Sequence, residues 1–147
     1  IKTLTSKVNK IYPKLLYKKI IELKKGHIKK KRQNHKKATF FSRRYPKDSH
    51  LKFDLNSADQ ISRIIKASVE PYPRAFFFHN KKKYFTSPKI KIEKNLFGVT
   101  GRIIKRNKES ITIICKENAI TLYKIYSLDN KLINPLKYRF KSGDNLN

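Results

Sequence analysis

The sequence predicts an α+β fold, in which a helical N-terminal part is followed by a small β-domain of barrel or sandwich type. Near the start of the chain, apolar residues recur every three or four positions, as in an amphipathic helix. In the second half, short runs of β-branched and aromatic residues alternate with polar turns. Between these parts lies a second, shorter helical pattern with a recognisable N-terminal cap.

The composition indicates a basic globular chain. Its 147 residues contain 37 Lys and Arg against 10 Asp and Glu, a net charge of +27 that favours polyanionic or phosphate-bearing partners. A hydrophobic content of 38% is enough for a core, so the chain is not a disordered basic arm. The length excludes a complete multidomain enzyme. The absence of a long apolar run predicts no membrane span, and we expect a cytoplasmic protein.

Two features of the composition qualify these expectations. The sequence begins at Ile1 and contains no Met, so we expect either a processed protein or the C-terminal fragment of a longer one. High Lys, Ile, Asn and Phe usage is typical of an A+T-rich coding sequence, which is an alternative source of part of the charge. The single Cys115 cannot form an internal disulfide, which agrees with a reducing compartment.

The first predicted helix covers residues 4–25. Pro13 predicts a kink or a division into two pieces, and Gly26 is suited to the left-handed C-terminal cap. Its apolar side is expected in the core, and a basic face leaves membrane-surface binding as a weaker alternative. Residues 27–37 have no apolar period and predict an exposed connector.

The middle of the chain predicts a short strand at residues 38–41, a turn, and a second helix. Ser57 and Gln60 form a capping box at its start. Its apolar face contains Ile61, Ile64, Ile65 and Ser68. Pro71 and Pro73 end the helix and force an extended passage.

The remaining half of the chain predicts five or six short strands. Candidate strands are residues 75–78, 83–86, 88–92, 101–105, 111–115 and 119–126. The polar segments 79–82, 106–109 and 116–118 separate them as turns.

No catalytic or metal site follows from the residues alone. The four histidines lack the short pairing of a zinc site, and Cys115 is better explained as a small buried residue than as a nucleophile. The four glycines form neither a GxGxxG nor a GxxxxGK loop. We therefore expect no catalytic residue and no metal ligand in this chain.

Basic clusters interleaved with aromatic residues favour binding of nucleic acid or another anion. The alternative is a solvated surface enlarged by codon usage. The residues proposed for this role are Lys29, Lys30, Lys31, Arg32, Lys81, Lys82 and Lys83.

Arg43, Arg44 and Asp48 are candidate substrate-binding residues. Paired arginines can clamp a phosphate or a carboxylate with two parallel hydrogen bonds. An ion pair between these arginines and Asp48 is the alternative.

The stretch ATFFSRRYPKD at residues 38–48 resembles the ATYF…R-x-P-x-D-G motif that closes the catalytic domain of folate-dependent formyltransferases. Ser57, Ala58 and Ile61 follow at the family's spacing, and EPYPRAF at residues 70–76 is similar to its P-[WY]-P-G-A-F motif. Segments 101–103, 111–115, 119–125 and 141–144 resemble the family's C-terminal OB-like barrel. Ser49, Phe53 and Arg74 depart from the family's usual Gly, Trp and Gly, and Arg74 puts the local turn in doubt.

This resemblance implies that residues 1–50 are the helical end of a truncated, Rossmann-like formyltransferase domain and that residues 51–147 are a small OB-like β-barrel. The parent enzyme would transfer a formyl group from 10-formyltetrahydrofolate to a primary amine. Its Asn-His-Asp catalytic set and its folate site would lie upstream of Ile1, so the N-terminal part would bind the cofactor.

The parent enzyme resembles two branches of the family, which differ in the acceptor of the formyl group. The Arg43-Arg44-x-Pro46-x-Asp48 stretch resembles sugar N-formyltransferases, which act on a nucleotide-linked amino sugar, and we favour this branch. The charge resembles methionyl-tRNA formyltransferases, whose basic barrel binds charged initiator tRNA. A non-catalytic, RNA-binding basic β-barrel is the alternative from another class. In a sugar enzyme, replacing Lys29, Lys30, Lys31 and Arg32 together should leave acceptor affinity nearly unchanged.

Overall fold

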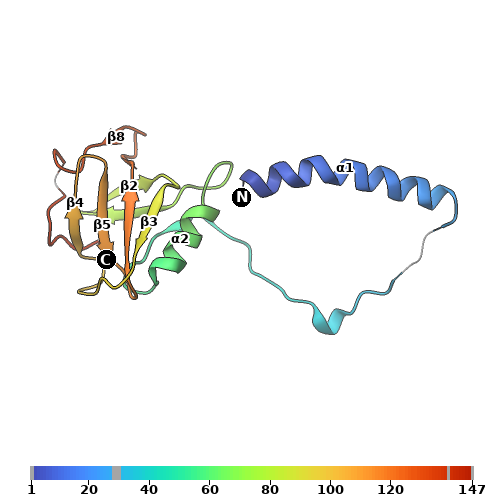
Figure 1. Ribbon diagram of the computed structural model, residues 1–147, viewed down its shortest axis with the longest axis horizontal. Coiled ribbons are helices and arrows are strands. Elements are labelled where there is room, and N and C mark those ends of the chain that lie inside the picture. The colour runs from blue at the N-terminus through green and yellow to red at the C-terminus, as the bar shows by residue number, and fades with distance from the viewer. Residues whose placement is uncertain (1, 28–30, 139, 147) are drawn as a thin grey trace. The chain divides into compact units, whose positions relative to one another are not determined.

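The computed structural model describes residues 2–27, 31–138 and 140–146 (Figure 1). The chain divides into two compact units, Ile1–Arg44 and Tyr45–Asn147. Each unit is described by itself.

The first unit begins with one continuous helix, α1 (Lys2–Lys24). The predicted division at Pro13 is wrong, because Pro13 lies inside the helix. A proline removes one backbone donor, and on this exposed helix water can satisfy the carbonyl left unpaired. The predicted end is confirmed: Gly26 has φ +72°, its N–H donates to the Leu23 carbonyl at 3.0 Å, and the His27 N–H donates to the Glu22 carbonyl at 3.0 Å.

The rest of the first unit contains a single 3₁₀ turn, η1 (His35–Lys37), among its described residues. The predicted strand at residues 38–41 is wrong. Phe40 and Phe41 are each 92% exposed, and no described segment pairs with them. A strand-like composition does not hold an isolated segment in a sheet, since a strand requires a partner.

The second unit opens with a 3₁₀ turn, η2 (Pro46–Ser49), followed by helix α2 (Ala58–Ala67). The capping box is confirmed: the Ser57 hydroxyl accepts from the Gln60 N–H at 3.3 Å, and the Gln60 side chain accepts from the Ser57 N–H at 2.8 Å. Ile61 and Ile65 are buried as predicted, and the helix packs against β3 and β6.

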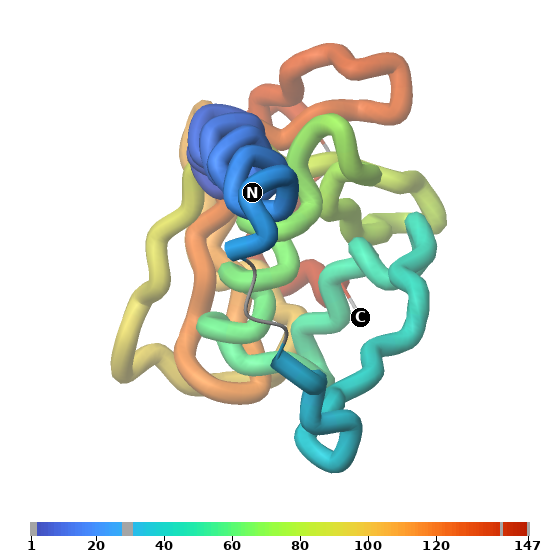
Figure 2. Tube along the Cα trace, turned by 90° about the vertical axis from the view of Figure 1, so that its right-hand side faces the viewer, coloured from blue at the N-terminus to red at the C-terminus, as the bar shows by residue number. Residues whose placement is uncertain are grey.

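Two antiparallel four-stranded sheets complete this unit, which confirms the α+β class. Sheet A has the order β1 (Phe76–His79), β2 (Lys82–Thr86), β7 (Ile125–Tyr126), β8 (Leu132–Ile133). Sheet B has the order β3 (Ile90–Glu93), β6 (Ala119–Tyr123), β5 (Ser110–Ile114), β4 (Ile103–Arg106). Figure 2 traces the chain from α2 (green) through these strands to the C-terminal segment (red).

The sheets remain open in the described part of the chain and do not close into a barrel. The run predicted as one strand at residues 119–126 is split at Lys124, which has φ +53°. This break directs β6 into sheet B and β7 into sheet A. Strand β8 was not predicted, because two residues are too few to show a period.

The core of the second unit lies between α2, the two sheets and the C-terminal segment. Phe77 is fully buried, and its ring centroid lies 6.2 Å from Phe53, 5.8 Å from Tyr84 and 6.3 Å from Phe140. Residues far apart in sequence therefore meet around one ring.

Candidate nucleic-acid interface

A row of aromatic side chains crosses sheet A on the face opposite Phe77 and Tyr84, and in this row Phe76 is 7% exposed while Phe85 and Tyr126 are half-buried. Phe76 pairs with Phe85, and Phe85 pairs with Tyr126, so the three rings come from three neighbouring strands. Residues directly opposite each other on antiparallel strands share a face. The next cross-strand pair, Phe77 and Tyr84, points into the core, and both residues are buried.

Two cations lie over this row. The Lys83 Nζ is 3.8 Å from the Phe76 ring centroid and 5.2 Å from that of Phe85. The Arg74 guanidinium carbon is 5.3 Å from the Phe85 centroid and 4.6 Å from the Tyr126 centroid. These distances are those of cation–π contacts. We call Arg74, Phe76, Lys83, Phe85 and Tyr126 the cation–aromatic face.

Arg74 stands where the resemblance expected Gly. It is not in the left-handed region of backbone conformation, so the position accepts a side chain without strain. Its Nη1 donates to the Asn130 side-chain oxygen at 2.7 Å, which fixes the guanidinium over the rings. The departure from the family pattern therefore adds a cation to this face rather than disturbing the turn.

His50 and Phe78 extend the aromatic surface at its β1 edge. The His50 ring stacks on Phe76 at 5.1 Å with an interplanar angle of 7° and meets Phe78 edge-on at 5.2 Å. Burial, followed by the charges of Lys52 and Lys83, lowers the pKa of His50. The imidazole is therefore neutral at pH 7 and acts as an aromatic surface.

The lysine cluster predicted from the sequence is divided by the β1–β2 hairpin. Asn80 and Lys81 form the turn with φ +48° and +62°, the conformation of a two-residue hairpin loop. Lys82 and Lys83 follow on one strand and point to opposite faces. Of the three, Lys83 belongs to the cation–aromatic face.

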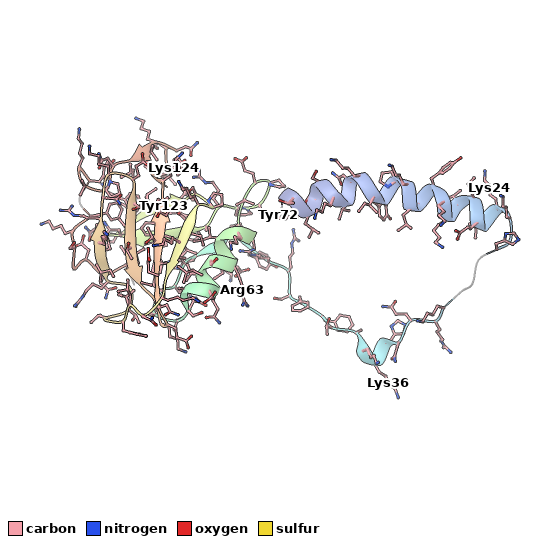
Figure 3. The ribbon with its side chains drawn as sticks, in the orientation of Figure 1. Lys24, Lys36, Arg63, Tyr72, Tyr123 and Lys124 are labelled. Carbon is pink, nitrogen blue, oxygen red and sulfur yellow. The ribbon has the colours of Figure 1, made fainter. Side chains whose placement is uncertain are left out.

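Basic side chains project from both units, including Lys24 and Lys36 in the first and Arg63 and Lys124 in the second (Figure 3). Lys31 and Arg32 are exposed in the first unit. Lys29 and Lys30 lie outside the described residues.

The predicted substrate-binding residues fall at the boundary between the units. Arg43 and Arg44 are exposed and end the first unit. Asp48 lies in η2, where its carboxylate accepts the Tyr45 N–H at 2.6 Å. This bond gives Asp48 a local structural role, and substrate binding by the three residues remains a prediction.

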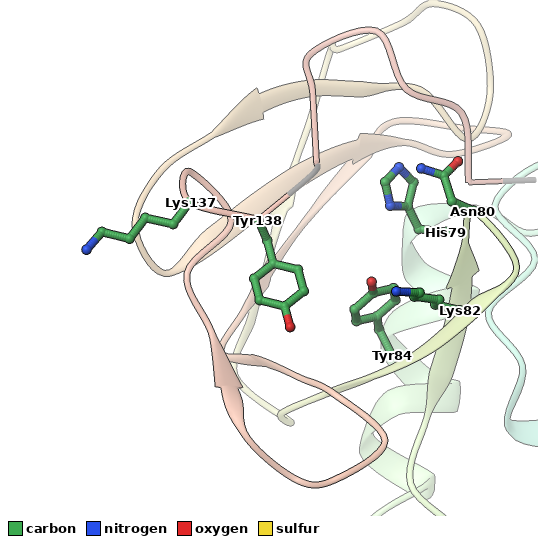
Figure 4. Close-up of a pocket in the computed structure, with 6 residues that line it drawn as sticks. All are labelled: His79, Asn80, Lys82, Tyr84, Lys137 and Tyr138. Atoms are coloured by element: carbon green, nitrogen blue, oxygen red, sulfur yellow. The ribbon is translucent and has the colours of Figure 1, made fainter.

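A second group of polar and aromatic residues surrounds a cavity of about 490 Å³ on the core side of the β1–β2 hairpin (Figure 4). One lining residue, His79, is buried. Its Nε2 atom lies 2.8 Å from the Asp144 carboxylate, and its ring stacks on that of Phe140 with the ring centroids 4.6 Å apart. Sequence reasoning missed this pair, because 65 residues separate its members.

The His79–Asp144 contact makes stability depend on pH. Burial alone raises the pKa of Asp144, but hydrogen bonds from the Lys141 N–H and His79 outweigh it and lower the pKa from 3.8. A carboxylate with a depressed pKa stabilises the fold above its unfolded pKa, and this contribution disappears as the pH falls through the folded value.

We expect Asp144→Asn to lower the free energy of unfolding by about 1–2 kcal/mol at pH 7, because the bonds to the charged carboxylate are weakened. The difference from the unsubstituted protein should shrink below about pH 4. Urea unfolding at pH 7, 5 and 3 measures it, with the exposed Asp129→Asn as control. A difference that is the same at all three pH values would contradict this assignment.

The structure bears on three further expectations. Cys115 is buried, as predicted, and burial raises its pKa to about 12, which disfavours the reactive thiolate. Among the described residues, no group of three or more His, Cys, Asp or Glu side chains is placed to hold a metal ion. No described helix combines the length and the apolar character needed to cross a bilayer.

Residues 44–139 match the family model described as formyl transferase, C-terminal domain. A methionyl-tRNA formyltransferase of a Sulfurihydrogenibium species is 29% identical over 89% of this chain, and the chain covers 43% of that relative, less than half its length. HypX from Aquifex aeolicus matches in fold, with a TM-score of 0.55 and 14% identity, over 77% of this chain and 19% of HypX. A second HypX structure, in complex with tetrahydrofolic acid, matches with a TM-score of 0.53, the same identity and the same two coverages.

Proposed function

The chain belongs to the family of formyl transferase C-terminal domains, and we propose that it serves a formyltransferase whose acceptor is an aminoacylated tRNA. The cation–aromatic face is the observation that carries the choice of acceptor. A relative named for methionyl-tRNA formylation supports the same choice.

The chemistry of this face suits a nucleic acid. The rings of Phe76, Phe85 and Tyr126 form a row across three strands, and Lys83 and Arg74 place positive charge directly over it. Phe76 is buried, so contact with exposed bases would fall to the half-buried rings of Phe85 and Tyr126, while the cations neutralise neighbouring phosphates. An open face of this kind fits an extended polyanion better than a small nucleotide-linked sugar, which is bound more tightly by an enclosed pocket.

Formyl transfer itself is assigned to another part of the enzyme. When bound, 10-formyltetrahydrofolate would supply the formyl group, and we assign none of the described residues to that cofactor. His79 is not a suitable proton carrier, since it is 4% exposed, its Nε2 contacts Asp144 and its ring lies against Phe140. This domain would therefore bind and orient the acceptor.

The basic residues outside the cation–aromatic face are proposed as auxiliary phosphate contacts. Arg43 and Arg44 would bind the acceptor from residues 1–50, which we propose to be the end of the catalytic domain, with residues 51–147 as the OB-like domain. The other cations proposed for this role are Lys29, Lys30, Lys31, Arg32, Lys81 and Lys82. We propose a cytoplasmic location, where charged tRNA is found.

Binding of the 147-residue chain to initiator tRNA at several salt concentrations tests this proposal. We expect at least Lys83 and Arg74 each to contact a phosphate. A plot of the logarithm of the binding constant against the logarithm of the salt concentration should therefore have a slope steeper than about −1.8. A nucleotide-linked amino sugar should not compete. Failure to bind tRNA, together with binding of the sugar nucleotide that is much tighter than binding of the same nucleotide without its sugar, would favour the sugar branch instead.

The enzymatic part of the proposal needs the full-length protein. Transfer of a labelled formyl group from 10-formyltetrahydrofolate to charged tRNA is expected. Salt-dependent tRNA binding without formyl transfer would instead indicate a non-catalytic RNA-binding module.

A further inference from the structure

The cavity of about 490 Å³ has the size of a small-molecule site, for which roughly 300–1,000 Å³ is usual. His79, Asn80, Lys82 and Tyr84 of the β1–β2 hairpin form one side, and Lys137 and Tyr138 of the C-terminal segment form the other. Tyr84 and Lys83 are consecutive in β2, so the cavity and the cation–aromatic face lie on opposite faces of sheet A.

Tyr84 is a buried polar side chain with unused hydrogen-bonding capacity. It is only 5% exposed, and its ring is held by a stacked contact with Phe77 at 5.8 Å and an edge contact with Phe140 at 5.1 Å. No described residue is hydrogen-bonded to its hydroxyl, and since no fully buried side-chain oxygen lacks a partner, the hydroxyl is accessible from the cavity that the residue lines. Burial, followed by the neighbouring Tyr138, raises the pKa of Tyr84 above 10.0, so the hydroxyl stays protonated and can donate.

Tyr138 supplies a ring with a free surface. It is 48% exposed, and Figure 4 shows its ring and that of Tyr84 on opposite sides of the cavity. An exposed tyrosine beside a buried one leaves room for a planar aromatic group to stack. The Asn80 side chain at the upper end of the cavity offers both a donor and an acceptor to the edge of such a group.

The charge of the cavity is positive. Lys82 lies beside Tyr84, whereas the side chain of Lys137 extends outward from the rim, away from the other lining residues (Figure 4). No Asp or Glu is among the lining residues, and neither lysine forms an ion pair with a described residue. The Asp144 carboxylate is already hydrogen-bonded to His79 and to the Lys141 N–H. The Lys82 ammonium group is therefore available to an anion in the cavity, and Lys137 adds positive charge at the rim.

We propose that this cavity binds one nucleotide, with its base against Tyr138, its base edge at the Tyr84 hydroxyl and Asn80, and its phosphate at Lys82, while Lys137 at the rim adds long-range attraction for the anion. A neutral aromatic ligand would not need the lysines, and a simple anion would not need the tyrosines. The nucleotide is either free in solution or an unstacked residue of an RNA strand. This site goes beyond the proposed tRNA role and uses none of the residues of the cation–aromatic face.

Calorimetric titration of the 147-residue chain with ribonucleoside 5′-monophosphates, the corresponding nucleosides and inorganic phosphate tests the proposal. The best monophosphate should bind at least about tenfold more tightly than its nucleoside, since a charge-assisted contact is lost with the phosphate. Inorganic phosphate that binds as tightly as the nucleotide would overturn the proposal and leave a simple anion site. Absence of binding by every nucleotide, free or in a strand, would also overturn it.

Variants separate the contributions of the ring, the hydroxyl and the charges. Tyr138→Ala should weaken nucleotide binding at least about fivefold through loss of stacking. Tyr84→Phe keeps the packed ring and should weaken it about two- to tenfold. Lys82→Ala combined with Lys137→Ala should abolish the preference for monophosphate over nucleoside. Affinity unchanged in all three variants would place the nucleotide elsewhere and refute the assignment.

Tyr72→Ala and Lys116→Ala are matched controls, because Tyr72 is 51% exposed and Lys116 is also exposed, and neither lines the cavity. Both should bind nucleotide as the unsubstituted chain does. A short single-stranded RNA distinguishes the two sources: tighter binding of the strand, sensitive to Tyr138→Ala, indicates an RNA residue, and equal binding of the monophosphate indicates a free nucleotide. If tRNA binding fails while nucleotide binding persists, the acceptor proposal is refuted and the cavity assignment stands.

Discussion

Phe77→Ala should lower the free energy of unfolding of the Tyr45–Asn147 unit by about 3–5 kcal/mol, as expected for loss of a fully buried aromatic ring. Phe77 is 0% exposed and lies among Phe53, Tyr84 and Phe140. These neighbours come from distant parts of the chain, and the rigid sheet between them prevents collapse into the cavity left behind.

Urea unfolding followed by circular dichroism measures this loss. Phe97→Ala is the matched control, because Phe97 is 77% exposed, and it should change stability by less than about 0.5 kcal/mol. If the alanine variant does not fold, Phe77→Leu should show a smaller loss in the same direction. A loss below about 1 kcal/mol for Phe77→Ala would mean that this ring is not central to the core.

Arg74→Ala combined with Lys83→Ala is expected to have the largest effect on tRNA binding. Loss of two phosphate contacts should make the log–log salt slope shallower by about 1.8, which corresponds to about sixtyfold weaker binding at about 0.1 M salt. The rings of the cation–aromatic face remain in this variant. Filter binding or fluorescence anisotropy over a range of salt concentrations gives both quantities.

A charge-matched control distinguishes a specific face from diffuse charge. Lys108 and Lys116 are exposed, and neither makes a cation–π contact with a described ring. Replacing both with alanine removes the same charge and should weaken binding much less. If the two double variants bind equally weakly, the charge of +27 acts as a whole, and the cation–aromatic face has no special role.

Our proposed acceptor differs from the one that the sequence motifs favoured. Sequence motifs favoured an amino sugar through Arg43, Arg44 and Asp48, but the Asp48 carboxylate caps the Tyr45 N–H. Arg74 was prominent only as a departure from the family motif. Its position over Phe85 and Tyr126 makes it part of a surface suited to nucleic acid.

The sequence by itself determined the elements that depend on nearby residues. The Ser57–Gln60 capping box, the left-handed Gly26 and the buried face of α2 were all predicted correctly. Each arises from hydrogen bonds or side-chain spacing within about one helical turn, so the local sequence contains the information. The same reasoning located the strands, since alternation and turn residues are also local.

Only the tertiary structure decided which residues meet. The strand expected at residues 38–41 is absent because no described segment pairs with it, a condition that its own composition cannot reveal. Of the three adjacent lysines, Lys81 lies in the hairpin turn, Lys82 lines the cavity and Lys83 belongs to the cation–aromatic face. Lys82 and Lys83 are separated because successive strand positions point to opposite sides of a sheet. His79 with Asp144, and Phe76 with Phe85 and Tyr126, meet through strand register and chain reversal. These long-range pairings depend on the packing of the whole unit, and short-range patterns in one sequence do not encode them.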